Sequence, residues 1–152
     1  MPAGDEAPSA GRFEGREHRL PVRVYYEDTD FTGVVYHANY ARYFERGRSD
    51  FLRLAGLDHS SLLGLDRPLA FAVTRLVIDF LKPARIDDPL EVRTRFSTVR
   101  GARFEIAQGL WRAGEPLASA DVRVACVDLA GRPRRLPPAL MARLHPFVRG
   151  DA

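Results

Sequence analysis

Residues 25–54 read YYEDTDFTGVVYHANYARYFERGRSDFLRL and contain the change of pattern that decides the fold. From residue 39 onwards, large apolar side chains recur every three or four positions, which is the spacing of one helix face. The positions on this face are Tyr40, Tyr43, Phe44, Gly47, Phe51 and Leu54. The spacing predicts a helix of about four turns over residues 39–54. Gly47 lies within the apolar face and would let the helix approach a sheet closely.

Alternating apolar and polar residues on both sides of this helix predict strands. One half-buried strand is expected over residues 20–26, before the helix. Residues 71–81 are apolar on both faces, as is typical of a central strand. Further strands are expected over residues 90–98, 104–110 and 118–126, and short helices over residues 60–63 and 138–144. The short turns between the later strands predict antiparallel neighbours.

This order of elements predicts an α+β fold, in which a five-stranded antiparallel sheet wraps around one long helix. A single domain is expected over residues 19–145, with a disordered N-terminal tail over residues 1–18 and a C-terminal tail over residues 146–152. One helix face can cover only one face of a sheet. The strands from Phe71 onwards are too apolar to face water, so the sequence predicts a homo-oligomer.

Composition limits the classes of function. The 152 residues carry 23 basic and 20 acidic side chains, and all the basic ones except Lys82 are arginines. Acidic residues are interleaved with the arginines, which argues against nucleic-acid binding. The net charge of only +3 favours codon bias in a GC-rich genome over a phosphate-binding surface as the source of the arginines. The lone Cys126 and four scattered histidines predict no disulfide and no metal site. A polar, acidic N-terminus and the lack of a long apolar run predict a cytoplasmic protein.

The loop before the long helix concentrates residues that can do chemistry. Asp30 lies in a turn next to the helix start, where free N–H groups and the helix dipole can hold an anion or polarise a carbonyl. A carboxylate there can act as a general base or as a nucleophile. His37 can orient water, shuttle a proton or donate only its backbone N–H. Structural roles are equally open, since Asp28 and Asp30 suit Asx turns and Asn39 suits a helix N-cap.

The same stretch resembles the signature of hotdog-fold acyl-CoA thioesterases of the 4-hydroxybenzoyl-CoA thioesterase type. It is most similar to the bacterial subgroup associated with the Tol–Pal cell-envelope system. The matching residues are Tyr26, Asp28, Asp30, Gly33, Val34, Val35, Tyr36, His37, Asn39, Tyr40 and the run FERGR at 44–48. A weaker match continues through residues 71–73, 79–84 and 87–90, and the whole resemblance covers roughly residues 19–144. The hotdog fold has the element order predicted above.

This resemblance implies hydrolysis of a short- to medium-chain or aromatic acyl-CoA to the free acid and CoA. It implies that Asp30 is the catalytic carboxylate and that the backbone N–H of His37 polarises the thioester carbonyl. Gly33 would let the turn close near the substrate, and Tyr26 and the His37 side chain match positions linked to activity. Direct attack by Asp30 and activation of water by Asp30 both stay open. CoA is part of the substrate, so no cofactor is expected.

The family binds the CoA nucleotide at a subunit interface through basic residues, and the resemblance implies a tetramer built from hotdog dimers. Candidates near strand ends are Lys82, Arg85, Arg100 and Arg103. For the acyl group, residues 57–69 and the helix residues Tyr43, Phe44 and Phe51 are candidates.

Two other functions remain open at this point. The chain could hydrolyse thioesters carried by acyl carrier protein, or it could be a non-catalytic acyl-ligand or scaffold protein of the cell-envelope system. Either would add a protein partner, and the second would suit a location at the periphery of the inner membrane.

Overall fold

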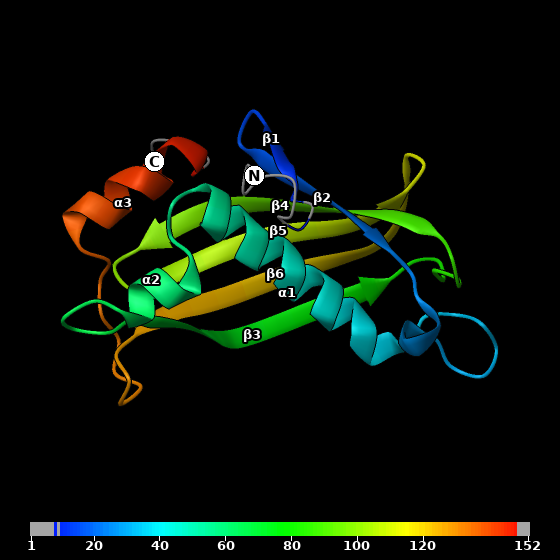
Figure 1. Cartoon of the computed structure of the whole chain (residues 1–152), viewed down its shortest axis with the longest axis horizontal. Coiled ribbons are helices and arrows are strands. Elements are labelled where there is room, and N and C mark those ends of the chain that lie inside the picture. Colours follow the sequence, from blue (N-terminus) through cyan, green and yellow to red (C-terminus); the bar gives the residue numbers. More distant parts are fainter. Residues whose placement is uncertain (1–7, 9, 149–152) are drawn as a thin grey trace, which may run out of the picture.

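The long helix α1 (His37–Leu54) lies across one face of a six-stranded antiparallel sheet (Figure 1). The computed structural model describes residue 8 and residues 10–148. The strand order in the sheet is β1-β2-β4-β5-β6-β3. The predicted α+β hotdog architecture is therefore confirmed, and the sheet has one strand more than the five expected.

The strands closely follow the alternating segments of the sequence. They are β1 (Arg12–Glu14), β2 (Glu17–Arg23), β3 (Ala70–Phe80), β4 (Pro89–Arg100), β5 (Arg103–Arg112) and β6 (Glu115–Val127). The shorter helices are η2 (Tyr26–Asp28), α2 (His59–Leu63), α3 (Pro138–Leu144) and η3 (His145–Phe147). Within the described residues, no helix is long and apolar enough to cross a membrane.

Gly47 marks the closest approach of α1 to the sheet, as its place in the helix predicted. A Cβ atom at this position would lie 2.6 Å from Val92 Cγ1 and 2.9 Å from Thr94 Oγ1, both on β4. Beside it, Gln108 Nε2 donates hydrogen bonds to the Phe44 carbonyl at 2.8 Å and to Thr94 Oγ1 at 2.9 Å. A polar group under the helix is thereby satisfied, and α1 is held against β4 and β5.

The N-terminal segment differs from the predicted tail over residues 1–18. β1 and β2 form a hairpin within this range, and β2 ends at Arg23, short of the predicted end at residue 26. The reason is that this segment carries its own apolar and buried groups. Phe13 packs against Phe51 of α1 and stacks on Phe147 of η3. The sheet therefore begins earlier than expected, and only residues 1–7 and 9 of the predicted tail lie outside the described residues.

His18 and Asp50 fix this hairpin to the second half of α1. His18 is fully buried, and its Nε2 lies 2.7 Å from Asp50 Oδ2. The same carboxylate oxygen accepts the Gly11 N–H at 2.8 Å, and Asp50 Oδ1 accepts a hydrogen bond from Arg53 at 3.2 Å. Residues 146–148 likewise belong to the ordered chain, whereas residues 149–152 of the predicted C-terminal tail lie outside the described part.

β3 lies at the edge of the sheet rather than in its centre, where its two apolar faces had placed it. It pairs with β6, and in the described part of the chain no strand pairs with its other edge. Val73, Leu76 and Phe80 are 49%, 39% and 52% exposed. An apolar edge strand of eleven residues with an open edge is a surface on which another strand can pair.

Candidate active site

A small hairpin between η2 and α1 carries Asp30. Thr29 pairs with Val35 in an antiparallel bridge, and the Asp30 N–H donates to the Val34 carbonyl at 2.9 Å. The Gly33 N–H donates back to the Asp30 carbonyl at 3.2 Å, and Gly33 has a φ of 82°, which favours glycine. We call this segment the Asp30 hairpin. It returns the chain directly to the start of α1.

Asn39 and Asp28 tie the Asp30 hairpin to the first turn of α1. Asn39 Nδ2 and the Tyr36 N–H both donate to the Asp28 carbonyl, at 2.8 Å and 3.0 Å. The Asp28 carboxylate accepts the Tyr25 N–H at 2.8 Å and so closes η2. Asp28 is therefore a structural residue. Asn39 is a side-chain tie rather than the N-cap, a position that Tyr36 occupies.

The segment between β3 and β4 supports the Asp30 hairpin from the other side. The Val35 N–H donates to the Ala84 carbonyl at 2.8 Å, and the Ile86 N–H donates to the Gly33 carbonyl at 3.0 Å. The Ala84 N–H in turn donates to the Tyr40 hydroxyl of α1 at 3.0 Å. Backbone hydrogen bonds on both sides thus fix the hairpin relative to the helix.

The Asp30 carboxylate is half-buried and has one oxygen engaged. Its Oδ1 accepts hydrogen bonds from the Thr32 hydroxyl at 2.5 Å and from the Thr32 N–H at 2.7 Å. These bonds, the hydroxyl first, lower the pKa of Asp30 below its ordinary value. Among the described residues, Asp30 Oδ2 has no hydrogen-bond partner. At neutral pH the site therefore presents a carboxylate anion with a free oxygen.

The start of α1 offers the complementary positive end. The N-cap Tyr36 makes no side-chain capping bond, and the first turn holds no acidic residue. The first N–H groups of a helix, here those of His37 and Ala38, have no partner within the helix. The His37 ring is exposed and lies against the Tyr36 ring, with 4.4 Å between centroids. An oxygen atom of a ligand can therefore bind at this helix start.

The structure brings three of the four predicted catalytic-loop residues together. Asp30 and Gly33 share the hairpin that leads into His37. Tyr26 lies on η2 beside them, but its side chain is 82% exposed and its hydroxyl makes no hydrogen bond in the described part of the chain. Among the described residues, no three His, Cys, Asp or Glu side chains gather where they could hold a metal ion.

The four CoA candidates fall into two pairs at opposite ends of the sheet. Arg85 forms a backbone bridge to the Asp30 hairpin, and Lys82 near it makes an ion pair of 3.0 Å with a β6 carboxylate. Arg100 and Arg103 face each other across the turn between β4 and β5. At ~3.3 Å per residue, the length of β4 separates the two pairs by about 35 Å. Within one chain they cannot bind the same phosphate.

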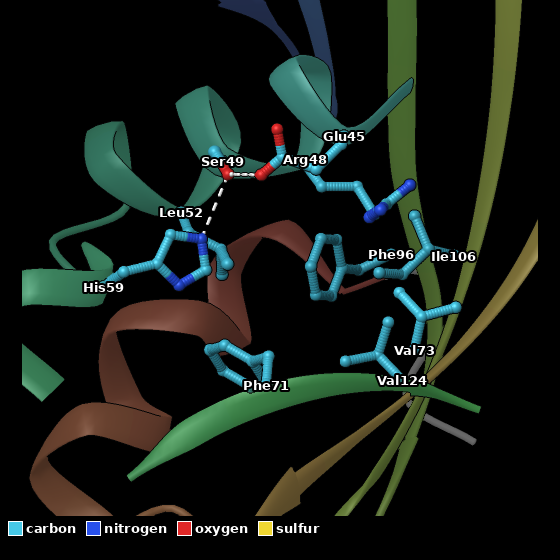
Figure 2. A pocket seen from close by; sticks show the side chains of 10 residues that line it. All are labelled: Glu45, Arg48, Ser49, Leu52, His59, Phe71, Val73, Phe96, Ile106 and Val124. Carbon is cyan, nitrogen blue, oxygen red and sulfur yellow. Dashed lines mark hydrogen bonds between the residues drawn. The ribbon is translucent and has the colours of Figure 1, made fainter. Parts of the chain in front are cut away.

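A cavity of about 110 Å³ lies farther along α1, between that helix, α2 and the sheet (Figure 2). Polar side chains from the helices line its upper wall, and apolar side chains from the sheet line its floor. The lining residues are Glu45, Arg48, Ser49, Leu52, His59, Phe71, Val73, Phe96, Ile106 and Val124. Ser49 Oγ donates to Glu45 Oε1 at 2.6 Å and lies 3.0 Å from His59 Nε2.

The helix residues expected to line an acyl site do not line this cavity. Tyr43, Phe44 and Phe51 are fully buried in the core between α1 and the sheet. Of residues 57–69, only His59 contributes to the lining. The apolar row of α1 packs onto the sheet, and the neighbouring, more polar row faces the cavity. The assignment of these residues to the acyl site therefore stays a prediction.

Known proteins resemble this chain in sequence and in fold. The sequence model of the thioesterase-like superfamily matches residues 24–144. The chain is 46% identical to the acyl-CoA thioesterase YbgC of Haemophilus influenzae over 127 residues, which is 83% of this chain and 93% of that protein. It is 41% identical to the acyl-CoA thioester hydrolase YbgC of Escherichia coli O6:H1 over 126 residues, 82% of this chain and 92% of that protein. A crystal structure of a probable thioesterase from Bartonella henselae matches with a TM-score of 0.77 at 44% identity, covering 80% of this chain and 99% of that one.

Proposed function

The chain belongs to the thioesterase-like superfamily and is an acyl-CoA thioesterase, and we propose that Asp30 is the carboxylate that carries its reaction. The resemblance to the Tol–Pal-associated subgroup is confirmed, because the YbgC proteins form that subgroup. One observation supports the role of Asp30 above all. An ionised carboxylate with a free oxygen lies on a hairpin that hydrogen bonds tie to the first turn of α1, and the start of that helix has no side-chain cap.

The reaction begins with the thioester carbonyl oxygen at the start of α1, where the His37 N–H donates to it. Asp30 accepts a proton from a water molecule while the water oxygen attacks the carbonyl carbon. The helix start stabilises the negative charge that develops on the carbonyl oxygen. As the C–S bond breaks, the sulfur of CoA takes the proton from Asp30. The products are the free acid and CoA.

Direct attack by Asp30 is the second route, in which the helix start stabilises the carbonyl oxygen in the same way. In that route Asp30 Oδ2 bonds to the acyl carbon, the C–S bond breaks and CoA leaves as a thiolate. Water then hydrolyses the acyl-aspartyl anhydride and restores the carboxylate. A single turnover in ¹⁸O-labelled water distinguishes the routes, because only the anhydride route can place the label in the Asp30 side chain.

Residues around Asp30 have supporting roles in the proposal. Gly33 closes the turn, and the exposed side chains of Tyr26 and His37 flank the substrate entrance. Lys82 and Arg85 lie next to the Asp30 hairpin and are the candidates for the CoA phosphates of the same chain. Arg100 and Arg103 would reach a CoA bound at this site only from a second copy of the chain.

The assembly in this proposal is a homo-oligomer in which two copies pair through their β3 edges, and two such dimers form a tetramer. The exposed apolar side chains of β3 and its open edge support this pairing. The reaction uses a carboxylate, water and backbone donors, so no cofactor beyond the CoA of the substrate is proposed. We place the enzyme in the cytoplasm, with an envelope protein or the periphery of the inner membrane as its candidate contact.

The test is hydrolysis of octanoyl-CoA, and the rate is measured from the CoA thiol that is released. Asp30→Asn should lower kcat by about 10²–10⁴-fold, the range for loss of a general acid–base group. Glu27→Gln, which changes an exposed carboxylate near the same hairpin, should keep the wild-type rate. Full activity of Asp30→Asn would overturn the assignment.

A second comparison addresses the alternative substrate. The same octanoyl group is presented on CoA and on acyl carrier protein, and the two values of kcat/KM are compared. A higher value with the carrier protein would favour the alternative. Saturable binding of octanoyl-CoA without turnover would favour a non-catalytic acyl-binding role.

A further inference from the structure

The cavity beside α1 contains an arginine without a counter-charge (Figure 2). Arg48 is half-buried, and burial lowers the pKa of its guanidinium, with Glu45 opposing the change. Of its five N–H donors, one reaches Gln108 Oε1 at 3.1 Å. In the described part of the chain, no carboxylate oxygen lies within 4.0 Å of the Arg48 guanidinium. Most of its hydrogen-bonding capacity is therefore available to a ligand.

The other polar groups of the cavity do not use this capacity. The Glu45 carboxylate turns toward Ser49, whereas the Arg48 side chain extends over the apolar floor toward Ile106 (Figure 2). Ser49 Oγ is shared between Glu45 at 2.6 Å and His59 at 3.0 Å. A partly desolvated cation above an apolar floor is costly to bury unless an anion completes it.

The cavity and the Asp30 site are flanked by the same two elements. Near the start of α1, Tyr40 lies edge-on to Phe80 of β3, with 5.0 Å between ring centroids. At the cavity, His59 of α2 lies edge-on to Phe71 at the other end of β3, at 6.3 Å. β3 therefore runs alongside α1 in the opposite direction, from the cavity at Phe71 to the catalytic end at Phe80.

The separation between the two places suits an acyl chain of medium length. Glu45 follows His37 by two helical turns, which is about 12 Å along α1. Helical side chains tilt toward the helix N-terminus, so the Arg48 guanidinium lies at about the same position along the helix axis as Glu45. An extended peptide spans about 3.6 Å per residue of three backbone bonds, and an extended acyl chain likewise advances ~1.2 Å per bond. About ten bonds would join the thioester carbonyl to Arg48.

We propose that Arg48 binds a carboxylate at the far end of the acyl chain, so that the enzyme prefers medium-chain acyl-CoAs with a terminal carboxylate. This inference rests on the function proposed above. The methylene chain would lie on apolar side chains, among them Phe71 and Val73, and the guanidinium would bind the carboxylate through two parallel hydrogen bonds. Arg48 is thus a specificity-determining residue and takes no part in the bond-breaking step.

The experiment compares matched substrates that differ only at the far end of the chain. Octanoyl-CoA and decanoyl-CoA are compared with the CoA monothioesters of octanedioic and decanedioic acid. The wild type should show a kcat/KM about tenfold higher or more for the carboxylated partner. Arg48→Met should lower kcat/KM for the carboxylated esters by about 10- to 100-fold, the effect of losing a charge-assisted hydrogen bond. The same variant should leave the alkyl esters within about twofold.

Two further variants separate the role in specificity from a role in folding. Arg48→Gln keeps a donor for Gln108 but removes the charge, and it should lose the same preference for the carboxylated esters. Arg42→Met removes an exposed arginine of α1 outside the cavity lining and should keep the wild-type preference. Thermal melts of each variant check that the fold is intact.

The outcomes distinguish failure of the inference about Arg48 from failure of the catalytic role proposed for Asp30. A wild type that prefers the alkyl esters, or an Arg48→Gln variant that slows both classes equally, overturns the role of Arg48 and leaves the thioesterase proposal standing. Full activity of Asp30→Asn instead overturns the catalytic assignment.

Discussion

Asp30 and Thr32 form the smallest unit on which the proposed chemistry depends. Thr32 donates two hydrogen bonds to one oxygen of Asp30 and lowers the pKa of the carboxyl. Ionised Asp30 is the active form in both routes, so activity should be lost as the pH falls through its pKa. The lowered pKa extends activity toward acid pH.

Replacing Thr32 by valine tests this coupling. Thr32→Val removes the hydroxyl donor but keeps the backbone N–H, so the pKa of Asp30 should rise. The acid limb of the pH profile of kcat/KM should move to higher pH, with little change on the plateau. Thr32→Ser keeps the hydroxyl and should retain the wild-type profile. An unshifted acid limb in Thr32→Val would contradict the role of this hydrogen bond.

Single residues also show how far the sequence can predict the site. Asp30, Gly33 and His37 follow from their order in one loop, and their grouping needs only local chain geometry. The orientation of Arg48 needs the fold, because helical spacing groups side chains into rows but does not say which row packs on the sheet. The tie from Asn39 to the Asp28 carbonyl was missed for a similar reason, since its acceptor lies eleven residues away.

At the scale of elements, the contact between α1 and β4 is set by Gly47. Gly47→Ala should gain about 1 kcal/mol of helix propensity. The added Cβ would lie 2.6 Å from Val92, and overpacking of this kind costs about 1–3 kcal/mol. We expect a net loss of stability, measured as a lower midpoint of urea unfolding. Gly64→Ala is the control, because its Cβ would meet only ordinary contacts of 3.4 Å and 3.6 Å.

The hairpin of β1 and β2 makes stability depend on pH through His18. Burial lowers the pKa of His18, and the hydrogen bond to Asp50 opposes this change only in part. The unfolded chain, with an ordinary pKa of about 6.5, therefore binds more protons than the folded chain as the pH falls below that value. The contribution of His18 to the free energy of unfolding should decrease on acidification.

His18→Gln tests this prediction because glutamine can donate to Asp50 but does not titrate. The free energy of unfolding is measured in urea at pH 7.5 and pH 5.5. The decrease between the two should be smaller in His18→Gln than in the wild type. His145→Gln changes an exposed histidine and should retain the wild-type decrease. Equal decreases in His18→Gln and the wild type would contradict the prediction.

Strand boundaries show why the sequence placed most elements well but misplaced two of them. β4, β5 and β6 alternate cleanly because one of their faces packs under α1. β1 and the start of β2 are short and mostly polar. They are held in place by contacts with α1 and η3, which are distant in sequence. β3 is apolar on both faces although it lies at an edge. Its composition therefore indicates burial that the single chain does not provide.

At the scale of the whole molecule, β3 has two proposed roles, which are pairing with a second copy and contact with the acyl chain. Its open edge is the surface proposed for pairing with a second copy. At one end, Phe80 contacts Tyr40 near the start of α1, and at the other end Phe71 and Val73 line the cavity that contains Arg48. Val73 and Phe80 remain half-exposed in one copy, so one chain alone would leave part of an acyl chain placed there open to solvent. In the proposed dimer the partner chain would cover it. Assembly and catalysis should therefore be coupled.

Leu76→Asp tests this coupling by placing a charge in the middle of β3. The wild-type chain of 17.1 kDa should give the mass of an oligomer in light scattering after size exclusion. The variant should shift toward the monomer, since a buried carboxylate without a partner opposes association. Its kcat/KM should fall with the oligomer fraction and recover as the protein concentration is raised. Leu129→Asp, at an exposed leucine after β6, should stay oligomeric and active. A monomeric wild type with full activity would contradict both the pairing and its link to the site.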